Sequence, residues 1–453
     1  MRVAIIGGGV AGSTMALFLS KEGVKTTLFE KRDSLISGPP FCHLHAGGNL
    51  YREISDEQCL TLLRQSIEFA NLYPFIVDKR PTIIATPKDD DTDPNLLKVR
   101  LKLLQDEYKK LIDIDQRYKV LGDAHDYFKI YDKKELLELK KEDIKRVPQS
   151  LDDWMIPFAK NVDLNTLRYP VYLVQEYGLN LFRLSGALEL YLKKQSSIDL
   201  KFNKEIKEIR KDGDKWIVDN EEFDYLINAA GFKTGMIDDI VGIKSERMVE
   251  FKAAFVTKCD TKGVLWPEVI FHGKRGTPNG MGQFTPYPNG YFQLHFMSKE
   301  ATLFSDGLSK NSKFSAQPKL KDRFIKKIEY GWEDIIVKKR TKKAIEHLSK
   351  FIPNFNIAKT ASIPLFGAQQ IPGSDPTLRV AEVSFDIKNY ARCEIVKVSS
   401  VIDMARGIFK DMGLGDIKLN DLVDIDEKEL SKKAKEIANK RGYPKDLASR
   451  LIN

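Results

Sequence analysis

The first thirty residues carry a regular succession of apolar and polar positions. Residues 2–6 are apolar and β-branched, which predicts a short buried strand. Apolar side chains at helical spacing predict a helix over residues 13–21, and residues 25–30 predict a second strand that ends in an acid. The glycine-rich turn GGGVAG at residues 7–12 separates the first strand from the helix. The pattern therefore predicts strand, glycine turn, helix and strand, in that order.

The glycine turn has the spacing of a dinucleotide-binding loop. Gly7 would let the chain turn sharply, Gly9 would let a pyrophosphate approach the backbone, and Gly12 would let the helix pack closely on the sheet. The N–H groups at the start of the helix would face the phosphates, and Glu30 would accept hydrogen bonds from ribose hydroxyls. The motif alone does not distinguish FAD from NAD. The expected contacts in this segment are Gly7, Gly9, Val10, Ala11, Gly12, Glu30 and Lys31.

The rest of the chain mixes helical and strand-like patterns. Helical periodicity predicts further helices at residues 55–72, 95–112, 133–147, 181–194, 319–350 and 395–412. Apolar runs predict further strands at residues 80–87, 200–202, 205–210, 215–218, 223–231 and 378–385. Short strands joined by Pro-Asn-Gly turns across residues 251–295 are typical of an antiparallel sheet. We expect the lysine-rich tail after residue 412 to pack loosely.

These elements predict an α/β protein with two domains, because 453 residues exceed one simple core. A discontinuous nucleotide-binding domain with a parallel sheet is expected from residues 1–78, 150–245 and 366–453. A second domain with an antiparallel sheet and a helical insertion is expected from residues 79–149 and 246–365.

The composition narrows the setting of the protein. No apolar run reaches the length of a membrane span, and the apolar start is explained by the first strand and helix, so we expect a cytoplasmic protein. The four cysteines are scattered without a CxxC pair, which argues against a zinc site or disulfides. The net charge of +9 fits an acidic substrate, an anionic membrane surface at the inner face, or nucleic acid. Lysines spread along the chain also fit a plain solvated surface.

Four stretches of the sequence resemble the D-amino-acid-oxidase-like (DAO) family of FAD-dependent oxidoreductases. They are GGGVAG at 7–12 with Glu30, HLHAGGNLY at 43–51, EYGLNLFRLSGAL at 176–188 and LINAAG at 226–231. The resemblance implies FAD as the cofactor, held in a Rossmann-like FAD-binding domain, with an antiparallel-sheet substrate domain beside it. It also implies that the LINAAG strand ends beside the FAD. This adds Asn228, Ala230 and Gly231 to the expected cofactor contacts.

The loop that begins at His43 resembles two different loops of flavoenzymes. One is the WHAAG loop of dimethylglycine and sarcosine dehydrogenases, in which a histidine is bonded to the flavin. The other is the HGG loop of glycerol-3-phosphate dehydrogenases, in which no bond forms. His45 is therefore either covalently attached to the flavin, hydrogen-bonded to it, or packed within the loop. The expected cofactor contacts in this loop are His43, His45, Ala46, Gly47 and Gly48.

The C-terminal part departs from the family pattern. The family has a glycine-rich turn at the pyrimidine end of the flavin, whereas this chain has NYARCEI at residues 389–395. The negative charge of the reduced flavin would then be stabilised by Arg392 and by the following helix N-terminus. A surface salt bridge between Arg392 and Glu394 is the alternative.

The resemblance places the substrate pocket on the antiparallel sheet. Candidates there are Arg275 for a carboxylate, Tyr287 for a hydroxyl contact, and His272 or His295 as a base, although each is also common as a turn or packing residue. The expected reaction is hydride transfer from a small amino acid, amine or 2-hydroxy acid to flavin N5, with reoxidation by quinone or oxygen. The alternatives are a malate-type 2-hydroxy acid:quinone dehydrogenase, an RNA-modifying flavoprotein and a flavin-binding protein without turnover. Nucleic acid is disfavoured because no RNA-binding module is visible.

Overall fold

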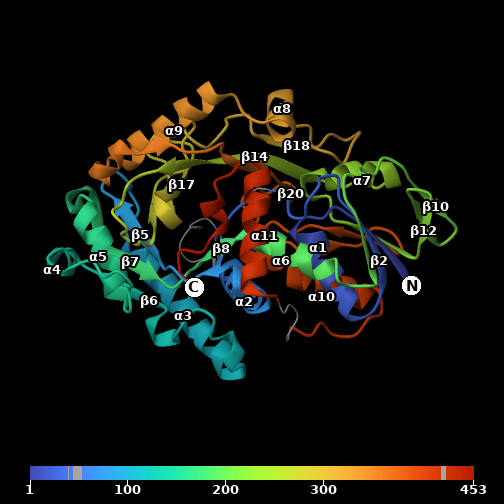
Figure 1. Ribbon diagram of the computed structural model, residues 1–453, viewed down its shortest axis with the longest axis horizontal. Coiled ribbons are helices and arrows are strands. Elements are labelled where there is room, and N and C mark those ends of the chain that lie inside the picture. The colour runs from blue at the N-terminus through green and yellow to red at the C-terminus, as the bar shows by residue number, and fades with distance from the viewer. Residues whose placement is uncertain (39, 44–53, 420–424, 453) are drawn as a thin grey trace.

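The computed structural model describes residues 1–38, 40–43, 54–419 and 425–452, and two large β-sheets organise it (Figure 1). The first sheet has six strands in the order β21-β22-β13-β1-β2-β9. All neighbours in it pair in parallel except β21 and β22. Its strands are β1 (Arg2–Ile6), β2 (Lys25–Phe29), β9 (Ile198–Lys201), β13 (Tyr225–Asn228), β21 (Val383–Ser384) and β22 (Tyr390–Cys393).

The second sheet has ten strands and is mostly antiparallel. The pair β5–β15 is parallel, and β14 is long enough to pair with β17, β18, β19 and β20. Its strands are β5 (Thr82–Pro87), β6 (Phe128–Tyr131), β7 (Leu167–Val174), β14 (Arg247–Lys258), β15 (Glu268–Phe271), β16 (Gly282–Tyr287), β17 (Tyr291–Phe296), β18 (Leu308–Lys310), β19 (Lys359–Thr360) and β20 (Leu365–Pro372). The mixed α/β architecture with one parallel and one antiparallel sheet is thus confirmed.

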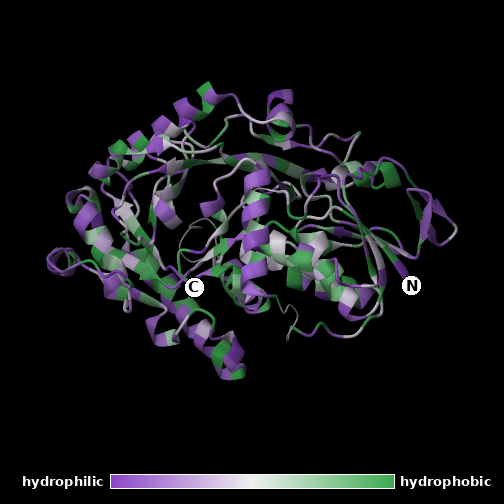
Figure 2. Ribbon diagram, viewed as in Figure 1, coloured by the Kyte–Doolittle hydropathy of each residue, from purple (hydrophilic) through white to green (hydrophobic). Residues whose placement is uncertain are grey.

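Helices cover both sheets. On the parallel sheet, α1 packs against α6 and α10, and Figure 2 shows hydrophobic residues gathered there. On the second sheet, α9 packs along β14 and β17 (Figure 1). The helices are α1 (Val10–Lys21), α2 (Asp56–Leu72), α3 (Asn95–Ile114), α4 (Lys133–Leu139), α5 (Leu151–Asn161), α6 (Leu181–Leu192), α7 (Thr234–Val241), α8 (Asp322–Tyr330), α9 (Asp334–Leu348), α10 (Val401–Asp411) and α11 (Glu427–Lys440).

Two small sheets complete the fold. A three-stranded antiparallel sheet projects beside β2 at the end of the molecule that carries the N-terminus (Figure 1). It consists of β10 (Ile209–Asp212), β11 (Lys215–Val218) and β12 (Glu221–Phe223). The other sheet lies between the large ones and consists of β3 (Phe41–His43), β4 (Val77–Asp78) and β8 (Gly178–Asn180). In the part of the chain that is described, no helix is long and apolar enough to cross a lipid bilayer.

The strand pairing differs from the domain boundaries expected from the sequence. Strand β7 lies within residues 150–245, expected in the nucleotide-binding domain, yet it pairs with β5 and β6 of the second sheet. Strand β20 likewise pairs with β14 and not with the parallel sheet. The strand expected at residues 378–385 shrinks to β21, and β22 takes the place next to β13. An apolar run indicates a strand but not the sheet that it joins.

The expectation of a loosely packed tail was wrong. Helix α11 packs against α6 and buries Leu430, Ala434 and Ile437. The two helices approach closely, because a Cβ on Gly186 of α6 would lie only 3.2 Å from the backbone nitrogen of Ala434. The apolar positions of α11 recur at helical spacing, but most of the residues between them are lysine, glutamate and other polar types.

Candidate active site

The glycine turn between β1 and α1 forms a cradle with open space in front of it. Gly7 has a φ of 105°, and a Cβ there would collide with the carbonyl of Ala229. A Cβ on Gly12 would collide with the carbonyl oxygen of Gly7, so α1 can approach β1 only with glycine here. By contrast, no atom of the described residues lies within 4 Å of a Cβ built on Gly9. The turn therefore leaves room for a ligand at the N-terminus of α1, as a diphosphate requires.

Glu30 stands at the end of β2 and holds the cradle together. Its carboxylate accepts hydrogen bonds of 2.7 Å from the backbone N–H of Gly8 and of Arg32. Beside it, burial and the neighbouring Lys233 lower the pKa of Lys31 to about 8. A cationic amine at this position becomes fully charged again when an anion lies next to it.

A cavity of about 1090 Å³ runs from this cradle to the second sheet. Gly7, Gly9, Val10, Ala11, Glu30 and Lys31 line one part of it, together with Ala230 and Gly231 at the end of β13. Its volume is at the upper end for ligand pockets, which suits a cofactor and a substrate together. Basic side chains outnumber acidic ones among its lining residues: Lys31, Arg32, Lys204, Lys233, Lys252, Arg275, Arg379, Lys397 and Arg441 against Glu30, Asp33 and Glu205.

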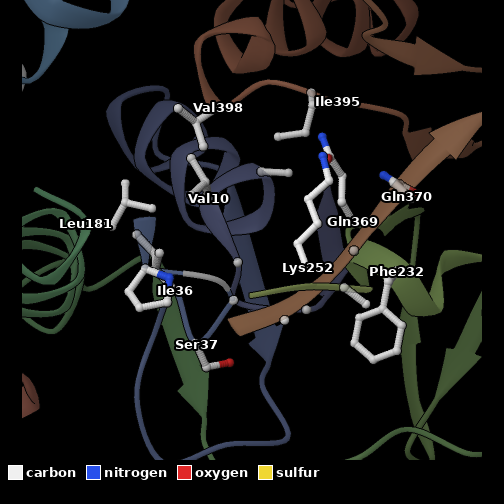
Figure 3. Close-up of a pocket in the computed structure, with 18 of the residues that line it drawn as sticks. Val10, Ile36, Ser37, Leu181, Phe232, Lys252, Gln369, Gln370, Ile395 and Val398 are labelled. Carbon is white, nitrogen blue, oxygen red and sulfur yellow. The ribbon is translucent and has the colours of Figure 1, made fainter. Parts of the chain in front are cut away.

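The second sheet contributes polar side chains to the opposite wall. Figure 3 shows Lys252 of β14 and Gln369 of β20 extending from neighbouring strands toward Ile395. The Nζ of Lys252 donates a 2.6 Å hydrogen bond to Gln369, and the amide of Gln369 donates to the carbonyl of Val396. Val398 lies beside Val10 of α1 on the other side of this space. The segment 395–398 therefore connects the cradle to the second sheet.

Arg275 lies at the same wall and belongs to a charged group around Glu250. Its guanidinium donates to the carboxylate of Glu250, which lies 3.3 Å from the Nζ of Lys252. Although burial opposes the shift, these two cations lower the pKa of Glu250 below its ordinary value. The group carries one net positive charge, since Arg275 and Lys252 face a single carboxylate.

His295 also lines the cavity, whereas Tyr287 and His272 do not appear among the lining residues that are described. His295 lies on β17 opposite Gln283 of β16, which also lines the cavity. Tyr287 instead points to Gln293, at 3.4 Å. Gln283 donates to Glu268, whose other oxygen accepts a 2.5 Å hydrogen bond from the fully buried Arg80. The cavity wall thus rests on a buried ion pair.

Arg392 does not line the cavity among the described residues, and its partners explain why. Its Nε donates a 2.5 Å hydrogen bond to Glu394, and its Nη1 lies 3.1 Å from Asp238 and 2.6 Å from Asp386. The pair with Glu394 named in the sequence interpretation is present, but it is buried and not on the surface. Arg247 joins the same cluster through Asp238 at 3.0 Å. The cluster holds Arg392 between the two sheets.

Asn228 and Gly12, two of the expected cofactor contacts, are not among the described residues that line the cavity. The amide of Asn228 donates 2.8 Å hydrogen bonds to the carbonyl of Thr234 and to the hydroxyl of Tyr390, which ties β13 to β22. His45, Ala46, Gly47 and Gly48 lie outside the described residues. His43 belongs to β3, where its backbone pairs with Gly178.

The sequence interpretation missed several residues at the cavity. Lys252 and Gln369 are polar positions within largely apolar strands, and their position was the available signal. Arg441 gave no such signal, because it follows a lysine-rich helix. Its guanidinium donates to the carbonyls of Ile36, at 3.0 Å, and Leu35, at 2.6 Å, just beyond the cradle.

Comparisons with known proteins agree with this geometry. Residues 2–87 match the model of the DAO family, described as FAD dependent oxidoreductase. No curated protein matches the chain significantly in sequence.

Several solved structures share the fold over nearly the whole chain. The L-amino acid deaminase from Proteus vulgaris superposes with a TM-score of 0.59 at 11% identity, covering 95% of this chain and 96% of that one. Glycine oxidase from Geobacillus kaustophilus superposes with a TM-score of 0.58 at 14% identity, covering 93% of this chain and 98% of that one. The FAD-bound L-alpha-glycerophosphate oxidase from Mycoplasma pneumoniae superposes with a TM-score of 0.56 at 16% identity, covering 92% of this chain and 96% of that one. The family match over the cradle and the shared fold over the rest of the chain make the chain similar to the FAD-dependent oxidoreductases of the DAO family.

Proposed function

We propose that the protein oxidises a small amino acid, amine or 2-hydroxy acid by hydride transfer to flavin N5. The observation that carries this proposal is the continuity of the cavity: the dinucleotide cradle and the polar wall of the second sheet line the same space. Bound FAD supplies the hydride acceptor, and the substrate carbon must lie against it. The chain itself then has to bind the anionic group of the substrate, remove a proton and exclude water.

Arg275 is the proposed partner of the substrate carboxylate. Its guanidinium carries five N–H donors, so it can keep Glu250 and hold a second carboxylate at the same time. The side chain is 44% exposed and lines the cavity, and Lys252 adds a second cation within reach of Glu250. Glu250 fixes the orientation of both cations and leaves a net positive charge for the substrate.

His295 is the proposed base. A neutral imidazole can take the proton of a substrate amine or hydroxyl near neutral pH. Its position opposite Gln283, which is itself fixed through Glu268 and Arg80, would limit rotation of this part of the wall. Met281, Met297 and Phe366 line the cavity and would keep water from the reacting carbon.

The test of this function is anaerobic mixing of the purified flavoprotein with separate sets of compounds. The sets are D- and L-amino acids, N-methylated amino acids, 2-hydroxy acids and glycerol 3-phosphate. Bleaching of the flavin absorbance by one of the first three sets supports the proposal. Bleaching by glycerol 3-phosphate alone, or by no compound at all, contradicts it. Admission of air, or of a water-soluble quinone, then shows which acceptor restores the colour.

Arg275→Ala should raise the KM of a carboxylate substrate about tenfold or more, because a charged hydrogen bond is lost. Arg275→Lys should recover part of this loss, since it keeps the charge but not the planar fork. Arg210→Ala is the control, because Arg210 is also exposed and lies on β10, away from the cavity. An unchanged KM in Arg275→Ala would remove this role from Arg275.

A further inference from the structure

The positive charge of the protein is concentrated in one short segment. Residues 313–350, which we call the basic edge, contain twelve Lys and Arg but five Asp and Glu. They therefore carry +7 of the net charge of +9. The lysines are not spread evenly as the composition suggested, and the rest of the chain is almost neutral.

The fold places this segment on the outside of the molecule. Helices α8 and α9 lie along the upper border in Figure 1, on the far side of the second sheet from α3. Lys321 and Arg323 share one acid, Asp306. Among the described residues, no ion pair is recorded for the exposed side chains of Lys313, Lys319, Lys326, Lys338, Lys339 and Lys350. Burial, and to a smaller extent the nearby Arg323, lower the pKa of Arg340.

Large apolar side chains stand out into solvent within the same edge. Phe314 is 85% exposed, Tyr330 84% and Ile335 74%. Tyr330 ends α8 and Ile335 lies in the first turn of α9, so they flank the short connection at Gly331. Figure 2 shows hydrophobic residues at the start of α9, followed by hydrophilic and hydrophobic stretches in turn. Exposed apolar groups surrounded by lysines are the composition of a segment that lies on a membrane surface.

We propose that the basic edge docks the protein on an anionic lipid bilayer. The lysines would lie at the acidic headgroups, and Phe314, Tyr330 and Ile335 would enter the boundary between headgroups and acyl chains. Nucleic acid fits less well, because the aliphatic Ile335 cannot stack on a base as an aromatic ring does. The inference rests on charge and exposure alone and does not depend on which substrate the cavity takes.

The docking surface lies directly over one wall of the cavity. Ile328 and Gly331, on either side of Tyr330, line the cavity, and the carbonyl of Ile328 accepts a 3.2 Å hydrogen bond from Arg32. Contact with a membrane would therefore act on residues next to the dinucleotide cradle. The flavin can report on docking through a change in its fluorescence.

The experiment is sedimentation of the purified flavoprotein with vesicles of phosphatidylcholine alone or with 30% phosphatidylserine as the chosen anionic probe. We expect binding to the anionic vesicles, at least tenfold weaker binding to the neutral ones, and release by high salt. Equal binding to both kinds, or no binding, would overturn the proposal. Preference for an equal charge of RNA in a competition would also overturn it.

Two double variants separate the contribution of the lysines to membrane binding from that of the exposed apolar side chains. Lys338→Glu with Lys339→Glu should abolish binding, and Tyr330→Ser with Ile335→Ser should weaken it about tenfold while keeping its salt dependence. The matched controls lie on α3, at the other side of the molecule: Lys98→Glu with Lys109→Glu, and Leu96→Ser with Val99→Ser, whose side chains are 66% and 73% exposed. The flavin absorbance of each variant verifies that it is folded. Wild-type binding by both edge variants would contradict the assignment.

Discussion

The two sheets contribute to the cavity in opposite ways. The parallel sheet offers backbone: glycines, N–H groups and the end of a strand, with Glu30 as the main side chain. The antiparallel sheet offers long side chains, among them Lys252, Arg275 and His295. A diphosphate binds to backbone N–H groups, so proteins with different substrates can bind it in the same way. A substrate, by contrast, is selected by side chains. The side of the cavity at the glycine turn therefore depends on close approach of the backbone, and the side at the second sheet depends on buried charge.

Gly12→Ala should have the largest effect. Its Cβ would collide with the carbonyl of Gly7, so α1 must move away from β1, and we expect an unstable protein without flavin. Gly9→Ala is the more selective variant, because within the described parts of the chain nothing lies within 4 Å of its Cβ, and its φ of −68° suits alanine. It should keep the thermal stability of the apoprotein yet bind FAD at least tenfold more weakly.

The measurements for these variants are thermal unfolding of the apoproteins and flavin titration. Gly23→Ala serves as a control for strain alone, because Gly23 has a φ of 65° and lies outside the cavity. If Gly9→Ala bound FAD like the wild type, the cofactor half would not rely on close approach of the backbone.

Arg80→Met tests the buried charge under the substrate half. It would remove the guanidinium that lies against the buried carboxylates of Asp78 and Glu268, at a cost of about 3–5 kcal/mol in the free energy of unfolding. Burial already raises the pKa of Asp78, so the loss should shrink as the pH falls and the carboxylates take up protons. Denaturant unfolding at two pH values measures both effects. A loss that does not depend on pH would point instead to the packing of Arg80 on Gly178, where a Cβ would lie 2.4 Å from the guanidinium.

Lys31→Met should have the smallest effect on cofactor binding. It tests whether Lys31 makes the FAD affinity depend on pH. The pKa of Lys31 is about 8 in the apoprotein, against an ordinary value of 10.5, so its amine is neutral above that pH. If Lys31 pairs with the cofactor, FAD affinity should fall as the pH rises above about 8. The same shift means that Lys31 lowers the stability of the apoprotein at neutral pH, a cost that disappears between pH 8 and 10.5.

Lys31→Met should bind FAD up to about tenfold more weakly at pH 7 and lose this pH dependence, as measured by titration of the apoprotein. The control is Lys21→Met, on the outer end of α1, away from the cavity. If the FAD affinity of Lys31→Met depended on pH as in the wild type, a group other than Lys31 would be responsible for that dependence.

The sequence predicted the elements whose roles follow from local chemistry. Strand β1, the glycine turn, α1 and β2 were located within a few residues, because periodicity and glycine spacing act over short distances. The antiparallel strands between residues 251 and 295 followed from their turns for the same reason. The FAD cofactor followed from the resemblance and is confirmed by the family match.

Long-range pairing could not be predicted in this way. Nothing in the residues around Arg392 indicates that Asp238, more than 150 positions earlier, lies 3.1 Å away. Likewise, Arg275 and His295 are among the described residues that line the cavity and Tyr287 is not, because strand register and turn geometry decide where each side chain lies. The residue types therefore indicated which side chains could take part in the chemistry, but not which of them lie at the cavity.

The contacts of Arg441 tie the segment beside the cradle to the last part of the chain. The cradle forms from the first thirty residues to leave the ribosome, yet its neighbours Leu35 and Ile36 receive their hydrogen bonds from a side chain about 400 positions later. Arg441 and Tyr443 are themselves part of the cavity wall. A nascent chain therefore contains the dinucleotide motif long before the whole cavity wall has been made, and we expect flavin to bind only after α11 has packed against α6. Chains cut before Arg441 should accordingly be purified without yellow colour.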